Sequence, residues 1–434
     1  MKKVLIITYY WIPSGGAGVQ RWVKFTKYLR NFGWEPVIYT PENPEYPSFD
    51  GSFENDIASD IEIIKTPIWE PFDIYRSLLG KKGQVINAGF ISEDKKKGWK
   101  DKLSVWIRGN FLIPDPRKFW VRPSVKFLSN YLRKNPVDVI VTTGPPHSMH
   151  LIAMRLKKHF PNIKWVADFR DPWTNIDFYK DLHLMKWADG MHHSLEKQVV
   201  MQADAITVVS KGMKDEFNLI RPDGLHIIPN GYDEDDVQMA QSAMDEQFTV
   251  SHIGTMNSAR NPLVVWKAMK SLCDENENFK KDLIIQLIGK VDFSILDALK
   301  KYGLKRHLIK TEYLTHDEAI KKQQSSQVLL LLINRSANAK GILTGKFFEY
   351  LASKRPVLGV GPLDGDAAQV LNETGAGVMV DFDDVEAAKK AIIHYYELYK
   401  KNQLTLETNS VEKYSRRNLT KDFSDLLNQM TTNA

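Results

Sequence analysis

A glycine-rich loop near the N-terminus, YYWIPSGGAGVQRW at residues 9–22, could bring backbone N–H groups close to a ligand. Gly15 and Gly16 come just before a helical pattern, and a helix N-terminus attracts anions. A dinucleotide-binding loop would have a third glycine where this sequence has Arg21, and an acidic residue near Thr40. The loop therefore favours a phosphate or a sugar, with Arg21 as a further charge. A tight turn without a ligand is the alternative.

A second glycine turn, GILTGKFFEYLASKRPVLGVG, starts at Gly341 and follows a buried apolar run. Lys346 would lie at the start of a helix, where its charge adds to a diphosphate site. Glu349, about one turn further on, could accept hydrogen bonds from both hydroxyls of a ribose. The alternative is that Lys346 and Glu349 form an i, i+3 pair on the surface. The backbone groups of this site would come from Leu343, Thr344, Gly345 and Lys346.

Charged residues also follow two predicted strands of the first half of the chain. Asp168, Arg170 and Asp171 lie in WVADFRDPW, where the chain leaves the sheet. His147 lies in GPPHS, at the same place one strand earlier and at a helix N-terminus. These side chains are either site residues or helix caps and structural groups, because both uses place polar residues at strand ends.

The sequence has no clear grouping of metal ligands and no clear motif for a catalytic nucleophile. His192 and His193 are adjacent and have no partners at zinc spacing. The nearest approach to an Asp-x-Asp metal site is DGD at 364–366, which more readily starts a helix. The sequence also lacks a Gly-x-Ser-x-Gly elbow and a Walker loop. We therefore predict no metal site and no cofactor.

Predicted strands and helices alternate nearly throughout, and the strands are apolar. This pattern predicts parallel sheets covered by helices on both faces, with ligands at the carboxyl ends of the strands. An acidic stretch at 233–247 separates two such series. The sequence therefore predicts an α/β protein with Rossmann-like domains at 1–235 and 236–414, facing each other across a cleft. A last helix near 415–434 is expected to pack on the first domain.

A basic segment with interspersed aromatic residues runs from Lys95 to Lys126. It holds ten Lys or Arg and two Asp, a local charge of +8, in a chain whose net charge is +6. This composition favours an anionic membrane surface as a partner, with a lipid-linked substrate. A solvated helix face over core aromatics is the alternative. Nucleic acid is disfavoured because no nucleic-acid-binding motif accompanies the segment.

The expected location is the cytoplasm, on the inner face of the cell membrane if the basic segment binds there. Cys273 is the single cysteine and cannot form an internal disulfide. No apolar run reaches the length of a membrane span, and VLLLLI at 328–333 suits a buried strand. The start, MKKVLIITYYWI, superficially resembles a signal peptide but lacks a small-x-small cleavage site.

Several motifs, taken in order, resemble those of a known family. Gly15 and Gly16 follow the first strand, and ADAITVVS is followed by IPNGYD. SHIGT then opens the second domain, and KFFEYLASKRPVL matches a donor-binding segment. The chain thus resembles the large family-four class of retaining glycosyltransferases with the GT-B fold. DFRDPW and IPDPRKFW suggest a bacterial surface-polysaccharide subgroup.

The resemblance has two departures in the donor segment. The family often has a glutamate where this chain has Gly341, so that Lys340 or the backbone would contact the sugar. It also often has an Arg where Thr255 stands, and Arg260 is a near match for the family's phosphate-binding Lys. The resemblance implies catalytic roles for His147, Arg170, Asp171 and Lys346. It implies donor binding by Gly15, Gly16, Thr255, Arg260, Lys340, Leu343, Thr344, Gly345, Lys346 and Glu349.

The implied activity is transfer of a sugar from a UDP- or GDP-linked donor to a hydroxyl of a glycan or lipid-linked acceptor, with retention and without a metal. The leaving phosphate would help to deprotonate the acceptor, and cations would stabilise its charge. Two alternatives stay open: a sugar-nucleotide epimerase of the same fold, and a non-catalytic sugar-nucleotide-binding subunit of a polysaccharide assembly complex.

Overall fold

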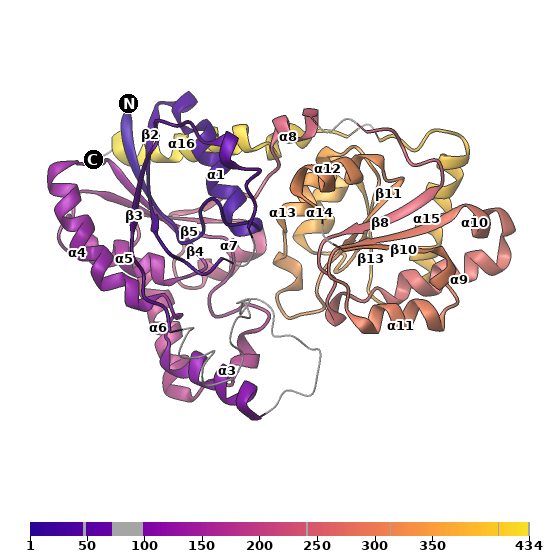
Figure 1. The fold of residues 1–434 in the computed structure, drawn as a ribbon, viewed down its shortest axis with the longest axis horizontal. Helices are drawn as coiled ribbons and strands as arrows, with labels where there is room; N and C mark the ends of the chain where they lie inside the picture. Colours follow the sequence, from indigo (N-terminus) through magenta and orange to yellow (C-terminus); the bar gives the residue numbers. More distant parts are fainter. Residues whose placement is uncertain (47–48, 72–98, 240–241, 313, 407, 433–434) are drawn as a thin grey trace. The chain divides into compact units, whose positions relative to one another are not determined.

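The computed structural model describes residues 1–46, 49–71, 99–239, 242–312, 314–406 and 408–432. It divides into two compact units (Figure 1): Met1–Pro229 with Arg417–Ala434, and Asn230–Arg416. The division falls before the acidic stretch, because α8 (Glu234–Met239) packs within the second unit. There Asp236 Oδ2 lies 3.1 Å from Nε2 of His316.

The first unit contains a seven-stranded parallel sheet in the order β3-β2-β1-β4-β5-β6-β7. Its central strands are buried along nearly their whole length, as expected for a parallel sheet covered on both faces. The strands are β1 (Lys2–Ile7), β2 (Trp34–Pro41), β3 (Glu62–Thr66), β4 (Val139–Gly144), β5 (Lys164–Phe169), β6 (Ala205–Val208) and β7 (Leu225–Ile227).

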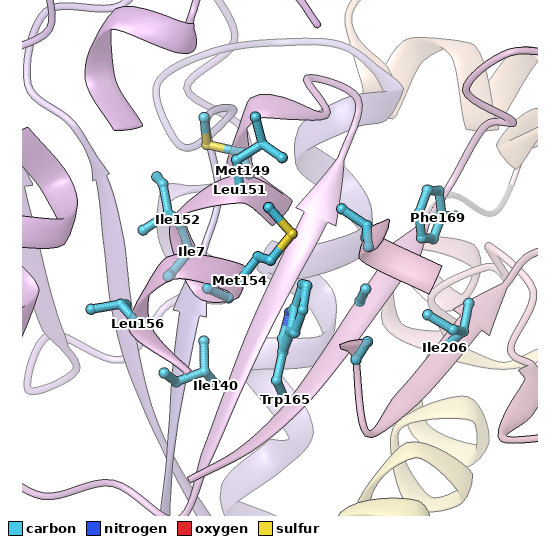
Figure 2. Packing of buried hydrophobic residues seen from close by; sticks show 14 of the residues in the cluster. Ile7, Ile140, Met149, Leu151, Ile152, Met154, Leu156, Trp165, Phe169 and Ile206 are labelled. Carbon is cyan, nitrogen blue, oxygen red and sulfur yellow. The ribbon is translucent and has the colours of Figure 1, made fainter. Parts of the chain in front are cut away.

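Helices cover both faces of this sheet. Figure 2 shows Met149, Ile152 and Leu156 of one helix packed beside Ile140 and Trp165 of the strands, all fully or almost fully buried. The helices are α1 (Ala17–Leu29), α3 (Trp99–Phe111), α4 (Lys118–Lys134), α5 (Ser148–Leu156), α6 (Lys186–Gln202), α7 (Lys211–Asn218) and α16 (Arg416–Thr432). Among the described residues, no helix combines the length and the apolar composition that a membrane span requires.

The last helix, α16, completes the core of the first unit. Its residues Leu419, Phe423 and Leu427 are buried in the same cluster as Trp22 and Phe25 of α1. The ring of Phe423 lies 5.5 Å from that of Trp22 in an edge-to-face contact. The chain therefore leaves the first unit after Pro229 and returns to it at Arg417.

The second unit contains a six-stranded parallel sheet in the order β10-β9-β8-β11-β12-β13. Its strands are β8 (Phe248–Ile253), β9 (Leu283–Ile288), β10 (Leu308–Thr311), β11 (Val328–Leu332), β12 (Val357–Val360) and β13 (Gly377–Val380). Its remaining helices are α9 (Leu263–Glu275), α10 (Glu277–Asp282), α11 (Phe293–Lys301), α12 (His316–Ser325), α13 (Gly345–Ala352), α14 (Asp366–Thr374) and α15 (Val385–Lys400).

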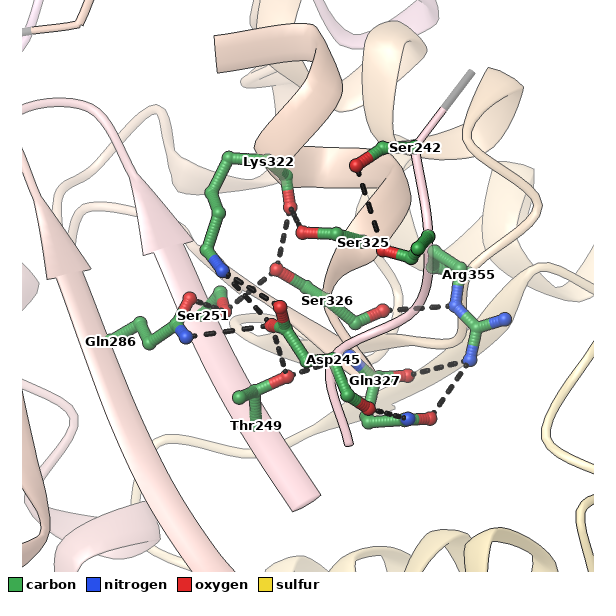
Figure 3. Close-up of polar contacts among 11 residues, drawn as sticks. Ser242, Asp245, Thr249, Ser251, Gln286, Lys322, Ser325, Ser326, Gln327 and Arg355 are labelled. Atoms are coloured by element: carbon green, nitrogen blue, oxygen red, sulfur yellow. Dashed lines mark hydrogen bonds and ion pairs between the residues drawn. The ribbon is translucent and has the colours of Figure 1, made fainter. Parts of the chain in front are cut away.

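A polar network ties the amino ends of three strands of this sheet together (Figure 3). Asp245, just before β8, accepts hydrogen bonds from Lys322 Nζ and from Thr249 Oγ1, each at 2.9 Å. Arg355, just before β12, donates to the carbonyl of Ser326 at 2.9 Å. Burial lowers the pKa of Arg355 to about 10. The network fixes this end of the sheet and leaves the carboxyl ends of the strands for a ligand.

The strand order reverses once in each sheet. In the first unit the reversal lies between β1 and β4, and in the second it lies between β8 and β11. Loops that follow strands on the two sides of such a point diverge, which leaves a crevice at the carboxyl ends. These two strand pairs therefore define where each unit should hold a ligand.

Candidate functional site

The buried carboxylate at the end of β5, Asp168, is fully paired. Its Oδ1 lies 2.9 Å from Arg21 Nη2 and accepts from Thr207 Oγ1 at 2.8 Å. Its Oδ2 accepts from Trp22 Nε1 and Thr143 Oγ1, each at 2.9 Å. Burial by itself raises the pKa of Asp168, but the charge and hydrogen bonds of Arg21 hold it below its usual value. Asp168 and Arg21 thus join α1 to the sheet, so Arg21 is not available to a donor phosphate.

Arg170, which follows β5, connects the first turn of α1 with the end of β4 and the loop after it. Its Nη1 donates to the carbonyl of Gly18 at 3.0 Å, and its Nη2 donates to the carbonyl of Pro145. Its backbone N–H donates to Gly144 at 2.9 Å. Burial lowers the pKa of Arg170, whereas the neighbouring Asp171 is exposed. Arg170 therefore holds the start of α1 and the loops that follow β4 and β5 together.

His147 lies at the start of α5 with its ring stacked on that of Trp173, at 4.6 Å. Its Nδ1 and the Nε2 of His150 are buried and have no hydrogen-bond partner among the described residues. Both atoms border Gly144, where an added Cβ would lie 2.8 Å from the first and 2.6 Å from the second. Burial lowers the pKa of both rings, that of His150 to about 3. Two neutral imidazoles thus flank the carboxyl end of β4.

The glycine loop turns into α1 at Gly16. This residue has a φ of 96° and is exposed, and an added Cβ would meet no atom within 4 Å. Glycine suits this position because the backbone conformation, not the available space, disfavours a side chain. Gly15 is buried beside it. The loop is open enough for a ligand to approach Gly16, and its role in donor binding stays a prediction.

Lys346, in the first turn of α13, reaches the carboxyl end of β8. Its Nζ lies 3.3 Å from the carbonyl oxygen of Ile253 and 3.4 Å from His252 Nε2. An added Cβ on Gly254 would lie 2.6 Å from this Nζ, so glycine is needed for the approach. Burial, and then the charge of Arg260, lower the pKa of Lys346 to about 7, although Glu349 acts in the opposite direction.

A second cation, Arg260, spans the switch point of the second sheet. Its Nε donates to Asn334 Oδ1 at 2.6 Å, and its Nη1 donates to the carbonyl of Thr255 at 3.2 Å. Thr255 follows β8 and Asn334 follows β11, the two strands at which the order reverses. Arg260 and Lys346 therefore place two basic groups where an α/β sheet holds its ligand.

The turn before α13 leaves polar groups unsatisfied. Thr344 is the N-cap, but its hydroxyl is buried and has no hydrogen-bond partner among the described residues. Gly345 follows with open space on its side-chain face. Leu343 is buried, and its carbonyl accepts from Asn230 Nδ2 at 3.3 Å. This hydroxyl, together with the N–H groups of the first helical turn, can donate to an anion beside Lys346.

Glu349 lies one turn along α13 from Lys346. Its Oε2 accepts from Gln323 Nε2 at 2.9 Å, and its Oε1 has no hydrogen-bond partner among the described residues. His316 lies nearby. Burial lowers the pKa of His316, but the hydrogen bond to Asp236 and the charge of Glu349 outweigh it and raise the pKa. Glu349 thus keeps a carboxylate oxygen for a ligand such as a ribose.

Two further basic residues of this unit are paired with carboxylates on the surface. Lys340 pairs with Asp364, and Arg335 pairs with Asp383, with all four side chains well exposed. Gly341, beside Lys340, ends a short 3-10 turn. A contact of Lys340 with the donor sugar therefore stays a prediction, and it would require the pair with Asp364 to open. In the described ranges, no three His, Cys, Asp or Glu residues are grouped as for a metal.

The comparisons with known proteins agree with this geometry. Residues 90–236 match the model of Glycosyltransferase Family 4. Solved structures of similar shape span nearly all of the chain. Sucrose-phosphate synthase from Thermosynechococcus elongatus has 14% identity, with 100% of this chain and 98% of that chain covered, at a TM-score of 0.56. HepE from Anabaena, solved with UDP-glucose, has 11% identity, coverage of 100% and 99%, and a TM-score of 0.55.

The chain has the GT-B fold. The family match supports a glycosyltransferase. The UDP-GlcNAc 2-epimerase from Methanocaldococcus jannaschii also has a similar structure, with 10% identity, coverage of 99% and 100%, and a TM-score of 0.50. The GT-B fold is therefore common to transferases and an epimerase, and it does not by itself decide the reaction. None of the curated protein sequences matches this chain.

Sequence reasoning missed three groups around the GT-B donor region. Asn334 holds Arg260, His252 contacts Lys346, and Tyr350 donates from its hydroxyl to the carbonyl of Ile253 at 3.4 Å. Asn334 could have been found, because it directly follows the buried strand VLLLLI, where ligand-binding residues are expected. His252 and Tyr350 lie inside a strand and a helix, where the pattern gives no sign of a polar partner.

The lowered pKa of Lys346 predicts proton uptake when a sugar nucleotide binds. The free amine is partly neutral at and above its pKa of about 7, and a diphosphate beside it favours the charged form. We expect affinity to fall as the pH rises through this value, with uptake of up to one proton per UDP-sugar bound. Titration calorimetry in two buffers of different ionisation enthalpy measures it. Lys346→Met should abolish the uptake, and equal uptake in that variant would contradict the assignment.

Proposed function

We propose that the chain is a glycosyltransferase that moves a sugar from a nucleoside diphosphate to an acceptor hydroxyl. The observation that carries this proposal is the cluster at the carboxyl ends of β8 and β11. It combines the ammonium of Lys346, the guanidinium of Arg260 and the unsatisfied start of α13. Such a cluster fits a diphosphate, and Glu349 one turn away fits the ribose attached to it.

The proposed chemistry needs charge stabilisation rather than a protein nucleophile. The bond between the anomeric carbon and the β-phosphate breaks, and the acceptor oxygen forms a bond to the same carbon. The acceptor proton passes to the leaving phosphate, which leaves as part of the nucleoside diphosphate. Lys346, Arg260 and the donors at the start of α13 would stabilise the negative charge that develops on that phosphate, without a metal. Retention follows from attack on the face that the phosphate leaves.

The first unit would hold the acceptor. The support is the edge formed by Gly16, His147 and the segments that Arg170 joins, which offers neutral imidazoles and open backbone near the ends of β1 and β4. The resemblance of the sequence suggests a UDP- or GDP-linked donor, a glycan or lipid-linked acceptor and a role in bacterial surface polysaccharide. The exposed aromatic side chains of Phe111, Phe119 and Trp187 suit contact with a membrane from the cytoplasmic side.

A product assay tests this function. The protein is incubated with UDP- and GDP-linked sugars, with and without glycan and lipid-linked acceptors, and the products are separated by mass spectrometry. Transfer that needs the acceptor is expected. An epimerised sugar or released nucleotide formed equally without acceptor would favour the epimerase, and binding without turnover of any sugar nucleotide would favour the non-catalytic subunit.

Titration calorimetry with the sugar nucleotide tests the role of Glu349 in donor binding. We expect Glu349→Gln to weaken donor binding roughly tenfold to a hundredfold, because hydrogen bonds to a charged group contribute about 1.5–3 kcal/mol. Glu397→Gln is the matched control, since Glu397 is exposed on α15, away from the cluster. Unchanged donor affinity in Glu349→Gln, or equal losses in both variants, would remove Glu349 from the site.

A further inference from the structure

A cavity of about 340 Å³ lies between α4 and the end of α5 in the first unit. Its lining is strongly basic. Arg122, Lys126 and Arg133 come from α4, Arg155 comes from the last turn of α5, and His159 follows that helix. Within the part of the chain that the structure describes, no Asp or Glu lines the cavity.

The spacing on α4 places its contributions on one face. Arg122, Lys126, Ser129 and Arg133 recur at i, i+4, i+7 and i+11, which is the repeat of a single helix stripe. Arg155 lies in the last turn of the neighbouring helix, and His159 lies three residues beyond the end of that helix. The two helices therefore bring their positive charges to a shared hollow rather than spreading them over the surface.

These charges are not neutralised within the unit. Among the described residues, the side chains of Arg122, Lys126 and Arg155 form no hydrogen bond or ion pair, and Arg133 donates only to Asn130 Oδ1, at 3.0 Å. Arg133 and Arg155 lie in the last turns of their helices, where a positive charge interacts favourably with the helix C-terminus. This interaction explains why these two positions are basic. It does not account for Arg122 and Lys126 in the first half of α4, where they repel each other as an i, i+4 pair.

We propose that this cavity binds a phosphate group, either free in solution or carried on the headgroup of an anionic lipid. Arginine side chains hold phosphate with paired N–H donors, and Ser129 and Asn130 add neutral polar groups at the same face. Phe127, next to Lys126, is 41% exposed, which is compatible with a lipid source.

The phosphate site is separate from the proposed acceptor edge. Helix α5 begins at Ser148, just after the carboxyl end of β4, and runs back along the sheet. Its last turn, with Arg155, therefore lies toward the amino ends of the strands. Binding in the cavity would anchor or orient the first unit without entering the chemistry, so it can be tested independently of glycosyl transfer.

Arginine footprinting tests the proposal on the unmodified protein. Phenylglyoxal labelling is followed residue by residue by mass spectrometry in three conditions: inorganic phosphate, phosphatidylcholine vesicles, and phosphatidylcholine vesicles with phosphatidylglycerol. We expect protection of Arg122 and Arg155, with Arg306, exposed in the second unit, as an internal reference. Protection by phosphate assigns a soluble ligand, and protection only by phosphatidylglycerol vesicles assigns a lipid headgroup. Absence of protection in all conditions, or equal protection of Arg306, overturns the site.

A charge-matched pair of variants separates the cavity from general positive charge. Arg122→Ala with Arg155→Ala should weaken binding of the protecting ligand about a hundredfold, because each of the two charge-assisted contacts removed contributes about tenfold. Lys134→Ala with Lys158→Ala removes the same charge from exposed residues that do not line the cavity. Equal weakening in both double variants would show a diffuse electrostatic effect and refute the site. Turnover with a soluble acceptor should be unchanged in both.

Discussion

Replacing Lys346 with methionine should lower kcat by about 10²–10³-fold, the usual effect of removing one donor that stabilises charge in a transition state. The ammonium lies 3.3 Å from the carbonyl of Ile253, at the end of β8, and no carboxylate forms an ion pair with it among the described residues. Methionine keeps the length and apolar packing of the stem, so the substitution mainly removes charge. Steady-state kinetics with a sugar nucleotide and its acceptor measure the effect.

A control substitution on α15 shows whether the fall in kcat is specific to Lys346. Lys390→Met removes one exposed positive charge from the same unit and should leave kcat nearly unchanged. A rise in KM alone for Lys346→Met would show that the residue binds the ground state and the transition state equally well. Turnover like that of the unmodified protein would remove Lys346 from the catalytic group.

Replacing Asp168 with asparagine should destabilise the first unit by about 3–5 kcal/mol, the usual cost of leaving a buried charge without its partner. Arg21 is almost fully buried, and its two contacts with the Asp168 carboxylate are 2.9 and 3.2 Å long. Hydrogen exchange of peptides from β1 and β5 measures the effect within the first unit, since the protein has two units and one global transition is not assured.

A control variant and the pH dependence of stability provide two further tests of this prediction. Asp223→Asn, which changes an exposed carboxylate paired with Arg221, should change exchange little. In native protein, the lowered pKa of Asp168 means that its contribution is present above the ordinary pKa of an aspartate and is lost as the pH falls through the lower, folded-state value. If Asp168→Asn exchanged like the unmodified protein, the pair would not hold the first unit together.

The sequence predicted most of the fold because its strands are strongly apolar and alternate with amphipathic helices. It did not predict β3 or α3. β3 is an edge strand in which no residue is fully buried, so it lacks the continuous apolar run that marked the other strands. α3 follows residues 72–98, which lie outside the described ranges together with Lys95 and its neighbours in the basic segment. A segment that is only partly buried has a weaker apolar pattern, so its secondary structure is harder to predict from the sequence.

The candidate site was partly predictable for a related reason. The carboxyl ends of parallel strands meet at one edge, so Lys346, Arg260, His147 and Arg170 could be chosen from their places in the chain. The pairings between side chains could not be predicted in this way. Arg21 and Asp168 are 147 positions apart, and their pairing depends on strand register and side-chain direction. For the same reason the sequence, which suggested a catalytic role for Arg170, did not predict that this residue joins the start of α1 to the loops after β4 and β5.

The return of α16 to the first unit has a consequence for how the chain is made. Leu419, Phe423 and Leu427 fill the core beside Trp22 and Phe25, yet they are translated only after the whole second unit. During synthesis, the hydrophobic core of the first unit stays incomplete until α16 has been made. The second unit is continuous from Asn230 to Arg416, so all of its strands are made before α16. The first unit is therefore begun first but completed last, and the apolar surface that α16 covers stays exposed until then, which favours aggregation.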